Sequence, residues 1–258
     1  MDLGLQGKRV LITGGSKGLG LACARAFMAE GARVALVSRS QDHLDTARAA
    51  LGEAFTWAAD LRDPDAAGQM VHEVETQFGP IDILVNSAGA ALRTAAEDLT
   101  PAGWHAAMDA KFFSYIHVID PMVKRMAARG SGVIVNIIGQ GGKVATPVHL
   151  AGGAANAALM LATAGLAHTY ASRGVRVVGL NPGLTQTERV SEGLRVEAQR
   201  AGITEQQALQ QAVGRLAMGR LAEADEIARI AVFAASAHGT YLTGANISVD
   251  GASTPTVV

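Results

Sequence analysis

The sequence predicts an α/β fold, a doubly wound parallel sheet with helices on both faces. Seven short runs rich in Val, Ile and Leu alternate with amphipathic stretches of helical period. Near-continuous apolar runs are typical of strands that are covered on both faces. A glycine-rich turn, "TGGSKGLG", joins the first run directly to the first helical stretch. The length fits as well, because 258 residues are enough for one large domain.

The expected elements follow one another in β–α order. Strands are expected at 9–13, 33–38, 55–60, 82–87, 132–137, 175–180 and 246–250. Helices are expected at 18–30, 41–51, 64–78, 101–129, 150–172 and 223–236, and glycines follow several of them as helix stops. Such connections are right-handed, which gives a Rossmann-type sheet. We expect a single domain over residues 1–258, with a helical flap at about 188–218 beyond the carboxyl ends of the strands.

The composition excludes several classes of protein. The net charge is −1, so no basic surface is expected for nucleic acid or an anionic membrane. The only cysteine, Cys23, cannot form an internal disulfide and has small apolar neighbours, which indicate a buried thiol. No signal peptide, bilayer-crossing run or metal-ligand spacing is recognised. These features predict a cytoplasmic protein that holds no metal.

The glycine-rich turn places Gly14, Gly18 and Gly20 between the first strand and the first helix. Glycines there let the backbone approach a pyrophosphate, which the helix N-terminus also favours. The T-G-x-x-x-G-x-G spacing resembles that of the short-chain dehydrogenase/reductase family. Four more segments resemble the family in the same order, "ADL" at 59–61, "NSAG" at 86–89, "NPGLTQT" at 181–187 and "LTGANISVDGA" at 242–252.

This resemblance implies a nicotinamide dinucleotide and the residues that hold it. Asp60 and Leu61 would lie at the adenine, while Thr187 and the backbone around Leu184 would hold the carboxamide of the nicotinamide. The implied cofactor-binding residues are Gly14, Ser16, Lys17, Gly18, Leu19, Gly20, Ser38, Arg39, Asp60, Leu61, Asn86, Ala88, Gly89, Pro182, Gly183, Leu184 and Thr187.

Charge at the end of the second strand favours NADP(H) over NAD(H). An NAD site usually has an acidic residue there for the ribose 2′-hydroxyl. This strand ends in Ser38 and Arg39, and Lys17 lies in the glycine-rich turn. Two cations without a carboxylate suit a 2′-phosphate. The alternative is that both are ordinary solvated cations.

The resemblance also implies four catalytic positions, an Asn, a Ser, a Tyr and a Lys. When the chain is aligned on its flanking motifs, these positions hold Lys111, Gly139, Gly152 and Asn156. Tyr115 lies in a different helix, and no Tyr or Ser occurs between Gly139 and Asn156. Hydride transfer to a carbonyl needs positioned donors and a proton. Ordinary carbonyl reduction by the family mechanism is therefore expected to be negligible.

Other side chains can take over the proton chemistry. Lys111 and Asn156 exchange the residue types of the family, so a cation can persist in the site, and Gln140 is a neutral donor beside Gly139. His149 precedes Gly152 by three residues and can reach the volume that the tyrosine leaves. The alternatives are a Lys111 that reaches solvent or a subunit interface, a histidine without a role, and glycines that serve helix contacts.

Three functions remain open. The first is an NADP(H) oxidoreductase with a non-standard site, for which activated C=C or C=N bonds would need less of an acid. The second is a non-redox lyase, hydratase or isomerase on the same fold, and the third is a catalytically inactive nucleotide-binding partner or sensor. The resemblance further implies a small-molecule substrate and a homodimer or homotetramer.

Overall fold

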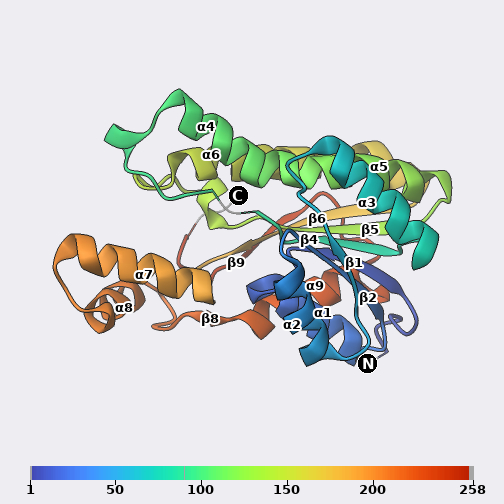
Figure 1. Ribbon diagram of the computed structural model, residues 1–258, viewed down its shortest axis with the longest axis horizontal. Helices are drawn as coiled ribbons and strands as arrows, with labels where there is room; N and C mark the ends of the chain where they lie inside the picture. The colour runs from blue at the N-terminus through green and yellow to red at the C-terminus, as the bar shows by residue number, and fades with distance from the viewer. Residues whose placement is uncertain (1, 90, 256–258) are drawn as a thin grey trace.

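The computed structural model describes residues 2–89 and 91–255, and its core is one seven-stranded parallel sheet (Figure 1). The strand order is β3-β2-β1-β4-β5-β6-β9. The strands are β1 (Arg9–Thr13), β2 (Arg33–Ser38), β3 (Phe55–Ala58), β4 (Ile83–Asn86), β5 (Gly132–Ile137), β6 (Val175–Pro182) and β9 (Asn246–Val249). The strand order reverses between β1 and β4, as in doubly wound folds. The predicted fold class is confirmed.

Helices cover both faces of this sheet (Figure 1). One face carries α1 (Gly18–Ala29), α2 (Gln41–Leu51) and α9 (Ala224–Ala235); the other carries α3 (Pro64–Gln77), α4 (Pro101–Ala107), α5 (Ser114–Ala128) and α6 (Leu150–Tyr170). Successive β1 side chains enter opposite cores, because Val10 and Ile12 pack with α1 and α9 whereas Leu11 packs with α3 and α5. Cys23 is fully buried, as expected, and burial raises the pKa of its thiol to about 12.

The helix expected at 101–129 is interrupted by a wider turn. Between α4 and α5 the chain forms a π-helix, Met108–Phe113 (η2). It contains Lys111, the one charged residue among the buried residues of the described chain. Single π-helical turns inside α-helices are often found at functional sites. The apolar periodicity of the sequence could not reveal this turn, because it changes the backbone hydrogen bonding and leaves the helix amphipathic.

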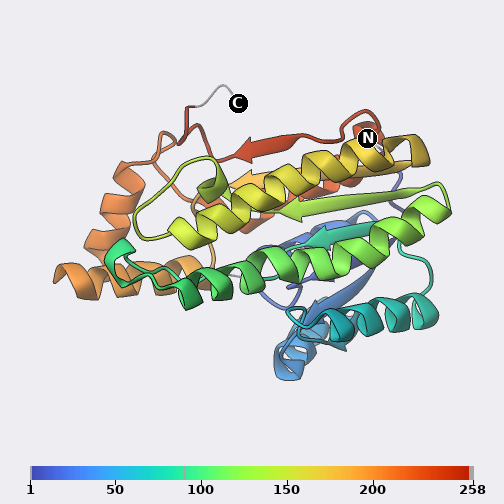
Figure 2. The same cartoon turned by 90° about the horizontal axis from the view of Figure 1, so that it is seen from above.

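Helix α6 corrects one expectation from the sequence. Residues Leu150–Arg173 are long and apolar enough, by length and composition, to cross a membrane, whereas no such run was expected. In the fold this helix lies on the sheet over β6 and against η2 (Figure 2). Leu159, Thr163 and Ala167 are among its buried residues. Its apolar character is therefore explained by packing in an α/β domain.

The strands point toward the end of the molecule that carries the flap (Figure 2). This flap consists of α7 (Glu188–Ala201) and α8 (Glu205–Gly214). A two-stranded pairing of β7 (Thr185–Gln186) with β8 (Ala222–Glu223) joins its two ends. Ligands of doubly wound folds bind at the carboxyl ends of the strands, so the flap lies where it can cover a ligand.

Candidate cofactor and catalytic site

The turn after β1 is shaped to admit a pyrophosphate. A Cβ atom on Gly14 would lie 2.8 Å from the backbone of Ala88, and one on Gly20 would collide with the carbonyl of Gly14. Gly18 has a φ of +53°, which favours glycine. The first turn of α1 has no side-chain cap, so its N–H groups are available for an anion. These residues fit the dinucleotide that the sequence implies.

Lys17 precedes α1 and contacts the flap. Its Nζ lies 3.4 Å from a carboxylate oxygen of Glu188, the first residue of α7. A Cβ atom on Gly18 would lie 3.7 Å from the Thr187 methyl group. The glycine-rich turn and the flap therefore meet at the edge of the expected cofactor cleft.

Side chains at the end of β2 form the expected adenine end of the site. The hydroxyls of Ser16 and Ser38 lie 3.0 Å apart, and the exposed Arg39 has no ion pair among the described residues. Arg62 donates hydrogen bonds to both carboxylate oxygens of Asp60, and this lowers the pKa of Asp60 to about 2. Arg62 therefore compensates the charge of Asp60, and the positive charge of Arg39 makes a smaller contribution to the lowered pKa.

A buried chain of hydrogen bonds connects the strand ends beneath the site. Thr13 Oγ1 donates to Asn86 Oδ1 (3.2 Å), and Asn86 Nδ2 donates to Asn136 Oδ1 (3.0 Å). Asn136 Nδ2 donates in turn to Thr163 Oγ1 (3.0 Å) of α6. Because buried amides need partners, these contacts fix β1, β4, β5 and α6 relative to one another. Asn86 thus shapes the site by holding the end of β4, which Ala88 and Gly89 follow.

The segment after β6 contains the residues that the sequence predicts to bind the carboxamide of the nicotinamide. The Leu184 carbonyl accepts a hydrogen bond from the Ala222 N–H (3.0 Å), and the Thr187 side chain caps α7 by accepting from Val190 N (3.4 Å). Gly183 is close to Asp250, since an added Cβ would lie 3.0 Å from it. The segment that holds the predicted carboxamide-binding residues therefore contacts β8 at Leu184 and the segment after β9 at Gly183.

Lys111 extends from η2 toward the end of β5. Its side chain is buried, with a residue exposure of 8%. Nζ donates hydrogen bonds to the Ile137 carbonyl (3.0 Å) and to the Tyr115 hydroxyl (2.8 Å). Val133 N bonds to Asp82 on the β4 side, and by the two-residue period of a strand the Ile137 carbonyl faces the same side. Lys111 Nζ therefore lies between the carboxyl ends of β4 and β5, and the alternative that it reaches solvent is wrong.

The histidine ring fills the space next to Gly152. Helix α6 begins at Leu150, so His149 is its N-cap residue. A Cβ atom on Gly152 would collide with the His149 imidazole, and one on Gly141 would lie 2.9 Å from His149 Cδ2. A Cβ on Gly153 would lie 2.7 Å from the Gly141 carbonyl. The glycine pair thus allows the imidazole and the loop after β5 to pack on α6 within the same chain.

Asn156 faces the same loop. The residue is 5% exposed, and its Nδ2 lies 3.4 Å from the place of a Cβ on Gly139. Gly139 has a φ of +116°, a conformation that is strained for any other residue. The structure therefore groups His149, Gly152 and Asn156 around the loop that starts at Gly139, while Lys111 lies at the adjoining strand end.

Gln140 makes a different contact from the one expected. Its Nε2 donates to Asp250 Oδ2 (2.8 Å), so the amide is hydrogen-bonded to the segment that follows β9. The neighbouring Lys143 donates to Asn246 O (3.1 Å) and Ser248 Oγ (3.0 Å). Sequence reasoning missed Asp250, because nothing local relates it to a residue so distant in the chain.

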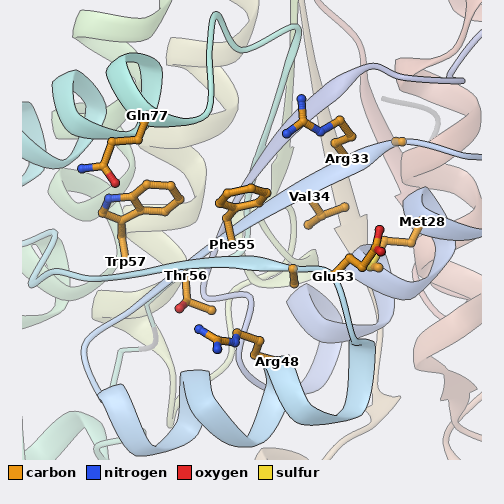
Figure 3. Close-up of a pocket in the computed structure, with 11 residues that line it drawn as sticks. Met28, Arg33, Val34, Arg48, Glu53, Phe55, Thr56, Trp57 and Gln77 are labelled. Atoms are coloured by element: carbon orange, nitrogen blue, oxygen red, sulfur yellow. The ribbon is translucent and has the colours of Figure 1, made fainter.

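Two cavities lie outside this group of side chains. One of about 620 Å³ surrounds the edge strand β3 and is lined by Arg33, Arg48, Phe55 and Trp57 among others (Figure 3). It lies at the amino ends of β2 and β3, away from the catalytic candidates. A hollow of about 490 Å³ at the start of the flap is lined by Gln186, Thr187, Glu188, Ser191, Glu192 and Arg195. Among the described residues, no cluster of His, Cys, Asp or Glu side chains could hold a metal.

A glycine-rich β1–α1 turn beside the point where the strand order reverses defines a dinucleotide-binding α/β protein. Comparison with known proteins gives the family. Residues 8–198 match the family model described as short chain dehydrogenase. The chain therefore belongs to the short chain dehydrogenase family of NAD(P)-dependent oxidoreductases.

Three relatives illustrate the similarity. The chain is 33% identical to D-threitol dehydrogenase of Mycolicibacterium smegmatis, covering 97% of this chain and 94% of that protein. It is 34% identical to galactitol 2-dehydrogenase (L-tagatose-forming) of Cereibacter sphaeroides, covering 96% and 95%. L-sorbose reductase of Gluconobacter frateurii, solved with NADPH and L-sorbose, superposes with a TM-score of 0.91 at 30% identity, covering 97% and 98%.

Proposed function

We propose that this protein is an NADP(H)-dependent oxidoreductase of the family in which Lys111 delivers the proton. The observation that carries the proposal is the placement of Lys111 Nζ, buried in a π-helical turn and aimed at the carboxyl end of β5. A lysine in such a place can act as an acid or base. The bound cofactor would supply the hydride, and the chain's own residues would orient the substrate and provide the proton.

Proton delivery differs from the family pattern at four positions in this proposal. Gly139 and Gly152 have no side chain to donate, and Asn156 stands at the lysine position. Positioned acids typically contribute about 10²–10⁴-fold in rate. We therefore expect ordinary carbonyl reduction by the family mechanism to be negligible, so that reduction of a ketose would depend on the proton from Lys111. His149 is the second candidate donor, because its ring lies against Gly152.

The charges at the adenine end support a preference for NADP(H) over NAD(H). Arg39 is exposed at the end of β2 and has no ion pair among the described residues, while Arg62 compensates the carboxylate of Asp60. Lys17 adds a second cation beside the glycine-rich turn. A guanidinium can bind a phosphate with two hydrogen bonds, which a ribose hydroxyl does not require.

The substrate class follows from the relatives and the reduced acid chemistry. Polyols and ketoses are the first candidates, because the named relatives act on D-threitol, galactitol and L-sorbose. Activated C=C and C=N bonds are the second, since they demand less of an acid. We further propose one domain over residues 1–258, with the flap at about 188–218 over the substrate. The protein would be a cytoplasmic homodimer or homotetramer without nucleic-acid or membrane partners.

Cofactor titration followed by a substrate panel tests this function. We expect NADPH to bind more tightly than NADH, as followed by nucleotide fluorescence. We expect oxidation of NADPH with at least one ketose, enone or imine. Lys111→Met should lower kcat by about 100-fold and leave the NADPH dissociation constant within about twofold, while His149→Ala should have a smaller effect on kcat.

Each other outcome has a definite meaning. Tight NADPH binding without turnover of any substrate would favour a nucleotide-binding partner or sensor. Failure to bind either nucleotide would favour a non-redox enzyme. Turnover that is unchanged in Lys111→Met would refute the proposed role of this residue, whatever the substrate.

A further inference from the structure

Lys111 and Tyr115 form a buried pair that the family pattern does not account for. They lie four residues apart, and the Tyr115 hydroxyl is 2.8 Å from Lys111 Nζ. The same hydroxyl donates a hydrogen bond to the Ile137 carbonyl (2.6 Å). Tyr115 is completely buried and is one of the largest fully buried side chains of the described chain. From the sequence we expected no role for Tyr115, because it lies in a different helix from the family's tyrosine.

We propose that Tyr115 is a positioning residue that holds Lys111 at the end of β5 and keeps its amine protonated. This inference rests on the proposed function, in which Lys111 delivers the proton. In this proposal Tyr115 acts through Lys111 and does not touch the reacting atoms.

The direction of the hydrogen bonds explains how the hydroxyl acts. A phenol has one proton, and the Tyr115 proton is used on the Ile137 carbonyl. A lone pair of its oxygen therefore faces Nζ and accepts from it. The aromatic ring of Tyr115 also stabilises the charged amine, because Nζ lies 4.4 Å from the ring centre. Two oxygen acceptors and an aromatic face all favour an ammonium over a neutral amine.

Packing alone does not account for a tyrosine at this position. A phenylalanine would fill the same volume among the apolar side chains of α5 and β5. Burying a hydroxyl has a cost unless it is hydrogen-bonded, and this hydroxyl bonds to the strand carbonyl and to Lys111. The hydroxyl oxygen therefore takes part in the polar contacts at the end of β5, while the ring packs in the apolar core.

The arrangement also keeps Lys111 in place after the proton has left. When Nζ gives one proton to the reduced substrate, the neutral amine still has two N–H groups for the same two acceptors. A proton from solvent then restores the ammonium. Tyr115 keeps its own proton throughout, because the Ile137 carbonyl holds it.

The pH profile of the reaction tests this role with Tyr115→Phe, which removes one oxygen atom and retains the ring. Reduction needs the protonated amine, so kcat falls at high pH as the amine loses its proton. We expect the falling limb to move to lower pH by about one unit, because a hydrogen bond to a charged group is lost. The KM and the NADPH dissociation constant should change less than about twofold. Tyr170→Phe, at the end of α6, is the matched control and should leave the profile unchanged.

A second measurement does not depend on turnover. In protein labelled with ¹⁵N at lysine Nζ, the ammonium of Lys111 should give a slowly exchanging NMR signal. The signal should be absent in Lys111→Met and shifted or broadened in Tyr115→Phe. Its absence from the wild-type spectrum would overturn the inference, whether or not the variant folds.

The two measurements separate this inference from the proposed function. If Lys111→Met loses activity but Tyr115→Phe keeps the wild-type pH profile, the role of Tyr115 is wrong and the proposed function stands. If no substrate is turned over, or if Lys111→Met is fully active, both fail together.

Discussion

The turn after β1 and the start of α6 are both rich in glycine, and in both a Cβ atom would meet a neighbouring group. In the first turn the neighbour of Gly14 is the backbone after β4, and the N–H groups of α1 remain uncapped. At the start of α6 the neighbour of Gly152 is the imidazole of His149, a side chain of the same helix end. In the first turn the glycines therefore admit backbone and leave the N–H groups of α1 without a side-chain cap, whereas at the start of α6 the glycine admits a side chain.

This difference shows how a glycine should be interpreted. Where it lets two backbones approach, main-chain N–H groups carry the function and the neighbouring side chains are free to vary. Where it admits a side chain, the chemistry depends on that side chain. The turn after β1, where we propose that the nucleotide binds, is of the first kind. The start of α6 is of the second kind, and in the proposed function the proton chemistry depends on Lys111, with His149 as the second candidate.

The largest effect is expected from Gly20→Val in the first turn. A side chain at this position would collide with the Gly14 carbonyl, so the turn must open and its N–H groups lose their alignment. We expect the NADPH dissociation constant to rise by about 100-fold or more, which corresponds to about 3 kcal/mol, as measured by nucleotide fluorescence. A fall in melting temperature should accompany it.

Gly68→Ala in α3 is the control for this substitution. Nothing lies within 4 Å of a Cβ atom there, and alanine is favoured over glycine inside a helix by about 0.5–1 kcal/mol. Its NADPH affinity should be that of the wild type, and its melting temperature equal or slightly higher. If Gly20→Val bound NADPH as tightly as the wild type, the glycines of the turn after β1 would not be needed for nucleotide binding, and their contrast with the glycines at the start of α6 would be lost.

The sequence predicted the fold well because the strands carry a continuous signal. Seven apolar runs match seven strands, and the glycine stops mark the helix ends. The position of Lys111 could also be predicted, but its inward direction depends on the π-helical turn and on the carbonyl of Ile137, which are set by tertiary packing. Tyr115 was dismissed for its position in the sequence, although its four-residue spacing from Lys111 was a usable signal.

The next largest effect is expected from Gly139→Ser, which restores the family's residue type. The φ of +116° at Gly139 is strained for serine, and such strain costs on the order of 1–3 kcal/mol. We expect this loss in the free energy of unfolding, measured by urea denaturation, and no gain in carbonyl reduction. Gly165→Ser in α6, where a Cβ meets nothing within 4 Å, should change stability much less. If the Gly139→Ser variant were stable and gained ketone reductase activity, the missing serine hydroxyl alone would account for the low carbonyl reduction expected of the wild type.

A smaller effect is expected from Arg39→Ala at the adenine end. Losing a guanidinium beside a 2′-phosphate should weaken NADPH binding by about tenfold, since a charge-assisted hydrogen bond contributes about 1.5–3 kcal/mol. NADH has no such phosphate, so its affinity should change less than about twofold. Arg25→Ala on the exposed face of α1 is the control and should affect neither nucleotide. If the affinities for NADPH and NADH fell equally, Arg39 would not bind the 2′-phosphate.

The smallest effect concerns the ion pair that compensates Asp60. Hydrogen bonds from Arg62 lower the pKa of the Asp60 carboxyl from 3.8 to about 2. A carboxyl whose pKa is lowered by folding stabilises the protein above its unfolded pKa, and this contribution is lost as the pH falls from about 4 to about 2. Both side chains are more than a third exposed, at 39% and 51%, so solvent screening limits the contribution to less than about 1 kcal/mol.

Urea denaturation at two pH values measures this contribution. Asp60→Asn should unfold slightly more easily than the wild type at pH of about 6, and the difference should shrink at pH of about 3, within the range in which Asp60 takes up its proton. Asp98→Asn removes an exposed carboxylate that has no ion pair among the described residues, and its difference from the wild type should not follow this trend. A gap that widened toward low pH would mean that Arg62 does not compensate the negative charge of Asp60. In that case Asp60 would oppose a 2′-phosphate, and the preference for NADP(H) would depend on Arg39 and Lys17 alone.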